Sequence, residues 1–311
     1  MSGLVAPPVW HPSTTGPSGT RFAHVVKSAT MRTAGTYDAV LVGEPYAMGS
    51  KAPATTTTVF REALAGLPTD VGDREFAASV GDLGDVGISH DGTDLSTVRA
   101  DVARFTGRVY ARDAVPVFFG SDSALTVPNA RPLLETGSVG MVSVGPSRTG
   151  PEPPVGPPPH AALLRAGLEA VSVLGPRERQ SQAGAAEDPR VVLDRYDAEH
   201  VVPADAVDRD PGAAMSQAIS ALGPVDAIFA SLDLAVVLGA NGTGADAGMG
   251  SIDGGLIEEA RVGQMLEQLA ATGRVAGFEV VSSAASMAGN GKGVRVGAAA
   301  IARFFAGLGG D

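Results

Sequence analysis

The sequence predicts an α/β protein with three layers, α/β/α, around a mostly parallel, doubly wound sheet of about eight strands. Short apolar runs typical of buried strands alternate with amphipathic helical patterns along most of the 311 residues. A hydrophobic content of 44% is enough to form a substantial core. Such alternation gives right-handed crossovers between parallel strands, so ligands are expected at the carboxyl ends of the strands.

Each predicted strand is a run with no polar face, as in strands that helices cover on both sides. In chain order the runs are YDAVLVGEP (37–45), AVPVFFG (114–120), GSVGMVSVG (137–145), EAVSVLG (169–175), VDAIFASLDLA (225–235) and RVAGFEVVSS (274–283).

Between these strands, apolar residues recur at steps of three and four, which is typical of helices with one buried face. The pattern covers residues 95–109, 262–269 and 301–308. Residues 1–35 are expected to form a flexible N-terminal arm and residues 36–311 a single domain. Two Pro- or Gly-rich stretches, 145–159 and 239–255, are interpreted as loops at strand ends, where binding sites concentrate.

The charge balance restricts the class of partner. A net charge of −11 repels phosphate backbones and anionic membranes, so the expected partner is a small-molecule metabolite rather than nucleic acid or a membrane. The first twenty residues lack the pattern of a secretion signal, and the expected location is cytoplasmic. Cysteine is absent, which excludes thiolate zinc sites and a cysteine nucleophile.

Local motifs for cofactors are weak. The glycine-rich stretch 239–255 lacks the Gly-Lys-Ser/Thr ending of a phosphate-binding loop and the spacing of a dinucleotide fingerprint. The five histidines have no local zinc spacing. The acidic stretch DLGDVGISHDGTD (82–94) is rich in turn formers and is interpreted as a solvated loop rather than a metal site.

Several motifs together resemble those of the ureohydrolase (arginase/agmatinase) family, over roughly residues 38 to 306. The motifs are VGEPYAMGSKAPA (42–54), DLGDV (82–86), PVFFGSDSALTVP (116–128), SLDLA (231–235) and GFEVVSS (277–283). The resemblance implies a three-layer α/β fold and hydrolysis of guanidino groups at a binuclear manganese site.

The chain departs from the family at the positions of the metal ligands. The first ligand histidine falls on Ser123, and the family's Asp-Ala-His-x-Asp falls on residues 145–149, which read Gly-Pro-Ser-Arg-Thr. Asp233 matches one carboxylate of the Ser-x-Asp-x-Asp motif, whereas Ala235 occupies the other position. One carboxylate cannot hold two divalent ions against water, so no metal and no other cofactor is expected.

The resemblance and the strand ends together give a candidate site. His160, which matches a loop histidine of the family, and Asp233 are interpreted as a proton-transfer pair. Glu279 matches an acidic position of the last motif, and Glu259 lies one residue before the family's guanidinium-binding glutamate. The full set is His160, Asp233, Asp122 and Ser123 for catalysis, and Ser147, Arg148, Glu279 and Glu259 for substrate binding.

Two functions remain open. One is a metal-independent enzyme that acts on a small amine- or guanidine-containing metabolite in bacterial biosynthesis, motivated by the polar replacements. The other is a catalytically inactive homologue, a pseudoenzyme, that serves as a structural or regulatory partner. A true manganese arginase is a third hypothesis, which the ligand count disfavours. The resemblance also implies a homo-oligomer, a trimer or hexamer, alone or together with an intact homologue.

Overall fold

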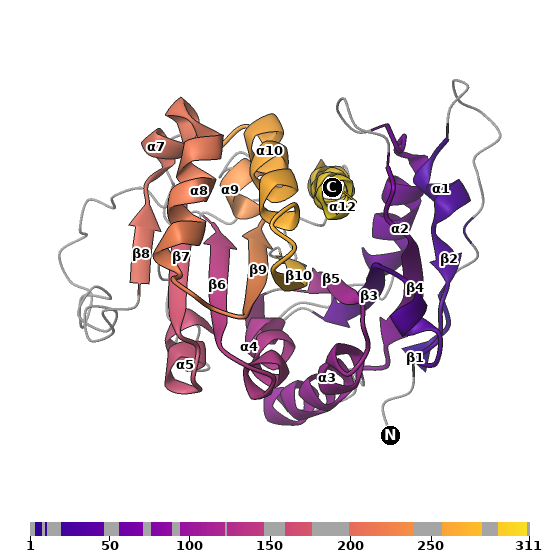
Figure 1. Cartoon of the computed structure of the whole chain (residues 1–311). Helices are drawn as coiled ribbons and strands as arrows, with labels where there is room; N and C mark the ends of the chain where they lie inside the picture. The colour runs from indigo at the N-terminus through magenta and orange to yellow at the C-terminus, as the bar shows by residue number, and fades with distance from the viewer. Residues whose placement is uncertain are drawn as a thin grey trace.

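The computed structural model in Figure 1 places a central sheet between two layers of helices. The structure describes residues 4–7, 10, 20–46, 56–70, 76–88, 94–121, 123–145, 159–175, 199–238, 257–281 and 292–309. Within these residues, no helix is long and apolar enough to cross a membrane.

The described strands form one sheet that is parallel except at one edge. Their bounds are β1 (Leu4–Val5), β2 (Lys27–Ser28), β3 (Ala39–Tyr46), β4 (Val80–Val86), β5 (Val115–Ser121), β6 (Val139–Val144), β7 (Ala170–Leu174), β8 (Glu199–Val202), β9 (Ala227–Asp233) and β10 (Val275–Val281). Their order in the sheet is β1-β4-β3-β5-β10-β9-β6-β7-β8, and β2 also pairs with β4. β1 pairs antiparallel with β4, and the other pairs are parallel. The predicted fold class is confirmed, although the sequence patterns had not indicated β1, β2, β4 or β8.

Helices cover both faces of the sheet, and the sheet separates the core into two clusters. The first face carries α2 (Thr56–Gly66), α8 (Pro211–Ala221), α10 (Glu259–Ala270) and α12 (Lys292–Leu308). The second face carries α3 (Leu95–Tyr110), α4 (Thr126–Ala130) and α5 (Pro159–Arg165). Shorter elements are α1 (Phe22–Val25), α7 (Ala204–Arg209), α9 (Ala235–Leu238) and the 3-10 turns η1 (Ala34–Thr36), η2 (Ser123–Leu125) and η3 (Arg131–Glu135).

The central strands are apolar throughout because both of their faces are buried. Two successive residues of β5 show this directly, since Phe119 joins the core of the first face and Phe118 that of the second. Alternate residues of a strand point to opposite faces, so a run without polar positions is required here. Both phenylalanines are at most 1% exposed.

The interpretation of residues 82–94 as a solvated loop is wrong for its first part. Asp82 lies inside strand β4 and is fully buried, and residues 89–93 lie outside the described part of the chain. Gly84, one of the turn formers in this stretch, serves close packing instead. A Cβ at Gly84, which has a φ of +87°, would lie 2.0 Å from the carbonyl oxygen of Val5 in β1. Glycine is therefore required for β1 to pair with this strand.

A buried guanidinium satisfies the carboxylates of β4. Arg61 of α2 donates from Nε and Nη2 to Asp82 at 2.7 and 3.0 Å, and from Nη1 to Asp85 at 2.6 Å. Burial acts to lower the pKa of Arg61, but the hydrogen bonds and charges of the two carboxylates outweigh it and leave that pKa raised. Thr57 and Trp10 add donors to Asp85 and Asp82 respectively.

The described residues of the first 35 belong to the sheet and its cover. β1 and β2 both pair with β4, Phe22 of α1 is fully buried, and the indole Nε1 of Trp10 donates to Asp82 at 2.9 Å. The division into an arm of residues 1–35 and a domain of 36–311 stays a prediction.

Replacing Arg61 by leucine should destabilise the protein strongly, because Asp82 would remain buried without its cation. Loss of one partner of a buried ion pair costs about 3–5 kcal/mol. Urea unfolding followed by circular dichroism measures this loss. Arg104→Leu is the matched control, because Arg104 pairs with Asp101 at the surface, where its side chain is 66% exposed, and such pairs contribute little. Equal midpoints for the two variants would contradict a role of Arg61 in stability.

Candidate functional site

Polar side chains gather where the central parallel strands end. The sheet order here is β5, β10, β9, β6. The next strand after β5 in the chain is β6, which lies three places away in the sheet. A change of winding direction of this kind opens a crevice at the carboxyl ends of the strands. Three residues here point toward the second face, that of α3 and α4: Glu44 of β3, Glu279 of β10 and Ser231 of β9.

The corner after β5 depends on a glycine and a short helical segment. Gly120 has a φ of +96°, and a Cβ there would lie 2.7 Å from Thr57 and 3.3 Å from the carbonyl oxygen of Glu44. The positive φ and the close approach of α2 therefore both favour glycine at this corner. The chain then forms η2, in which Ser123 is exposed, and enters α4 at Thr126. Asp122 lies outside the described residues.

Glu279 is fully buried beneath this corner, and neutral groups hold its carboxylate. Its Oε1 accepts hydrogen bonds from Thr126 Oγ1 and Ser231 Oγ, both at 2.7 Å. Its Oε2 accepts from Asn129 Nδ2 at 3.2 Å. Burial raises the pKa of Glu279, although these hydrogen bonds act in the opposite direction, and the charge of Asp233 adds to the increase.

A second buried carboxylate belongs to the same network. The Nδ2 group of Asn129 donates to Glu44 Oε2 at 3.0 Å as well as to Glu279, so one amide joins β3 and β10. Tyr110 of α3 donates its hydroxyl to the backbone oxygen of Asn129 at 3.0 Å. Burial, and then the charges of Glu279 and Glu44, raise the pKa of Tyr110 well above its ordinary value.

Sequence reasoning missed Glu44, Asn129, Thr126 and Ser231 as parts of this site. A usable signal existed for Glu44, because a carboxylate inside the apolar run AVLVGEP has to find donors when the strand is buried. Nothing in the local pattern around Asn129 indicates its two partners, which lie 85 and 150 residues away in the chain.

Asp233 ends β9 on the face that Ser231 occupies, because residues two apart in a strand point the same way. The side chain is half-buried, and its Oδ1 accepts a hydrogen bond from the backbone N–H of Ala235 at 2.9 Å. Burial raises the pKa of Asp233, while this hydrogen bond opposes the change. A carboxyl with a raised pKa is a stronger base than an ordinary aspartate, which suits proton transfer.

His160 lies on the second face as well. It occupies the first turn of α5, is 9% exposed, and belongs to the helix whose Leu163 and Leu164 join the core with α3 and α4. Asp233 and His160 therefore share one face of the sheet. Their role as a proton-transfer pair stays a prediction, as do the roles of Ser147 and Arg148, which lie outside the described residues.

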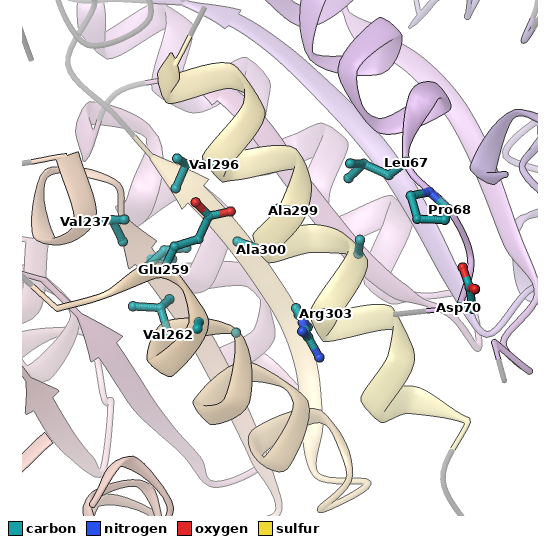
Figure 2. Close-up of a pocket in the computed structure, with 14 residues that line it drawn as sticks. Leu67, Pro68, Asp70, Val237, Glu259, Val262, Val296, Ala299, Ala300 and Arg303 are labelled. Atoms are coloured by element: carbon teal, nitrogen blue, oxygen red, sulfur yellow. The ribbon is translucent and has the colours of Figure 1, made fainter. Parts of the chain in front are cut away.

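Glu259 lies on the opposite face from Glu279. It is exposed in the first turn of α10, whose buried residues join the core of the first face. Figure 2 shows it at one side of a groove that crosses α12, with Asp70 at the other side and Arg303 nearer the end of the helix. The groove has a volume of about 500 Å³ and an apolar floor that includes Leu232, Val262, Val296 and Ala300.

The donor atoms of the described residues do not fit the pair of manganese ions that the family resemblance implies. At the end of β9 the carboxylate of Asp233 is followed by Ala235, which offers no side-chain donor, and η2 offers the hydroxyl of Ser123. No group of three or more histidine, aspartate or glutamate side chains in the described ranges is placed to hold a metal ion. Positions 122 and 146–150 are outside those ranges.

Comparison with known proteins gives a consistent set of relatives. No protein-family profile matches the chain. The formimidoylglutamase of Halobacterium salinarum is 35% identical over 309 residues, which cover 96% of this chain and 97% of that protein.

The fold is shared with solved structures at lower identity. Formimidoylglutamase from Bacillus subtilis superposes with a TM-score of 0.76 at 16% identity, covering 95% of this chain and 94% of the other. Formiminoglutamase from Trypanosoma cruzi, solved with Mn²⁺, gives 0.71 at 20% identity, covering 91% and 99%. Arginase from Bacillus subtilis gives 0.64 at 18% identity, covering 88% and 98%.

Replacing Asp233 by asparagine should stabilise the folded protein at neutral pH. The pKa of Asp233 is raised from 3.8 in the folded protein. The stability that the protonated side chain contributes is therefore fully present below pH 3.8 and is lost as pH rises through the raised pKa. Asparagine keeps an acceptor for the N–H of Ala235 and removes the buried charge. Thermal unfolding is measured at several pH values. The melting temperature of the variant should rise above that of the wild type as pH increases past 3.8, and the difference should then stay constant.

Asp226→Asn is the control of opposite sign. Hydrogen bonds from the backbone and side chain of Ser138 lower the pKa of Asp226, so this variant should lose stability at neutral pH. An Asp233→Asn protein that unfolds as early as Asp226→Asn would contradict the burial of Asp233.

Proposed function

Because this chain belongs to the ureohydrolase (arginase/agmatinase) family, we propose that it hydrolyses a carbon–nitrogen bond in a small metabolite that carries a formimidoyl or guanidino group. The identity of 35% with a formimidoylglutamase, extending over nearly the whole chain, is the observation that carries the proposal. N-formimidoyl-L-glutamate is accordingly the first substrate to test, followed by agmatine and arginine.

The proposed reaction balances without a redox partner. Water adds to the formimidoyl carbon, the bond from that carbon to the amine nitrogen breaks, and the products are the free amine and formamide. The water gives a proton to a base, and the leaving amine nitrogen receives one from an acid. Well-placed side chains accelerate such transfers by about 10²–10⁴-fold.

Asp233 is the proposed base, since its carboxylate is half-buried at a strand end and its pKa is raised by burial. His160 is the proposed acid on the same face, and Asp122 and Ser123 are proposed to contact the reacting group from the β5 corner. Arg148 and Ser147 are proposed to bind a carboxylate of the substrate, because a guanidinium pairs with carboxylates in two-pronged geometry. The substrate-binding role of Glu259 stays a prediction, because Glu259 begins α10 on the other face of the sheet from Asp233 and His160. The proposed reaction uses no metal ion, because the donor atoms of the described residues do not fit a pair of manganese ions.

A second candidate function is a non-catalytic subunit of a homo-oligomer or of a complex with an intact homologue. Two residues favour it, since Ala235 and Ser123 stand at positions where the family has metal ligands. Trimer or hexamer formation is proposed for either function, and light scattering on the purified chain measures it.

Turnover should persist after metals are removed. Purified protein is treated with EDTA, its manganese content is measured, and release of glutamate and formamide from N-formimidoyl-L-glutamate is followed with and without added Mn²⁺. The proposal expects equal rates in both samples and a loss of about 10²-fold or more in Asp233→Ala.

Other outcomes separate the alternatives. Activity that appears only with stoichiometric manganese would overturn the metal-independent mechanism. No turnover on formimidoyl or guanidino substrates, combined with copurification of an intact homologue from the native source, would favour the non-catalytic subunit.

A further inference from the structure

The two segments that carry Ser123 and Asp233 are not neighbours in the sheet. Ser123 follows β5 and Asp233 ends β9, and strand β10 lies between them. Backbone hydrogen bonds of the sheet fix each strand against the next, but they do not fix the corner after β5, where η2 and α4 have left the sheet. The relative placement of the two segments therefore depends on side chains.

One oxygen atom of the intervening strand joins both segments. Oε1 of Glu279 accepts Thr126 Oγ1 from the first turn of α4 and Ser231 Oγ from β9, each at 2.7 Å. Ser231 is directly opposite Glu279 in the register of β9 and β10 and precedes Asp233 by two residues on the same face. Oε2 extends the connection through Asn129 to β3.

The described partners of Glu279 include no cation. Glu279 is fully buried, its described partners are neutral, and burial disfavours its ionised form. Well-packed apolar residues often replace even buried ion pairs without loss of stability. Glu279 joins three elements at the edge of a candidate site. Its presence there is explained if the geometry of that site depends on it.

We propose that Glu279 is a positioning residue, which fixes the orientation of Asp233 relative to the β5 corner through its shared acceptor oxygen. Its effect on turnover rests on the proposed function, whereas its effect on the geometry of Asp233 does not. Glu279 then acts without touching the substrate. The substrate-binding role expected from the sequence would require a ligand to displace one of the donors that hold its carboxylate.

Hydrogen exchange at a single amide tests the geometric part. The N–H of Ala235 donates to Asp233 Oδ1 at 2.9 Å, so its exchange rate reports how firmly that carboxylate is held. In Ser231→Ala, Glu279 loses one donor, and amide exchange measured by NMR should be about tenfold faster or more at Ala235. Thr126→Val should have the same effect, and Thr126→Ser, which keeps the hydroxyl, should restore the slow exchange.

Ser172→Ala is the matched control. Ser172 is a fully buried serine on β7 whose hydroxyl donates at 2.7 Å to the carbonyl oxygen of Ala218, on the first face of the sheet. Its removal should lower the melting temperature about as much as Ser231→Ala does and leave exchange at Ala235 unchanged. Equal exchange at Ala235 in Ser231→Ala and Ser172→Ala, or fast exchange in Thr126→Ser, would overturn the proposal.

The same variants separate the two proposals. With an active wild-type protein, Ser231→Ala should lower kcat by about tenfold or more with a smaller change in KM, and Ser172→Ala should leave both unchanged. If the wild type has no activity but the exchange pattern is as expected, the proposed function fails and the positioning role stands. If turnover is normal in Ser231→Ala while exchange is fast, the proposed function stands and Glu279 has no part in it.

Discussion

Burial on both faces is the constraint on which the rest of this structure depends. A parallel sheet covered by helices on each side leaves no water near its central strands, so every charged side chain there needs donors or a counter-ion from the protein. Asp82, Glu44 and Glu279 are all fully buried. The elements that supply their partners, α2 for the first and α4 for the other two, are thereby fixed against the sheet.

The two buried networks satisfy this constraint in different ways, with different consequences. Asp82 and Asp85 face a cation, Arg61, whose charged form their negative charge favours despite its burial. Glu279 has only neutral donors among its described partners, and burial raises its pKa. The first arrangement ties the edge of the sheet, where β4 pairs with β1 and β2, to α2. The second keeps a carboxyl group whose ionised form burial disfavours, and it lies beside the strand ends where ligands bind in folds of this type.

The sequence was sufficient for the fold class because helix and strand periodicities are local signals. The runs at 114–120, 137–145 and 225–235 coincide with β5, β6 and β9, and the pattern at 95–109 coincides with α3. The site was less accessible to sequence reasoning. Its hydrogen bonds join residues far apart in the chain, such as Thr126 and Glu279 at a separation of 153 residues. The glycine of DLGDV suggested a turn, because nothing local shows that β1 approaches that strand so closely.

The carboxyl groups whose ionisation burial disfavours lie together at the carboxyl edge of β9 and β10, which supports a function there. Burial raises the pKa of both Asp233 and Glu279, which lie on the same face, and the charge of Asp233 adds to the increase at Glu279. Asp226, at the opposite end of the sheet beside the start of β9, has instead a lowered pKa because Ser138 donates to it twice. A protein under selection for stability alone has no reason to place its destabilised carboxylates together at one edge. A buried carboxylate at a strand end is suited to take up a proton from water or to bind a cation, because little solvent is present to compete.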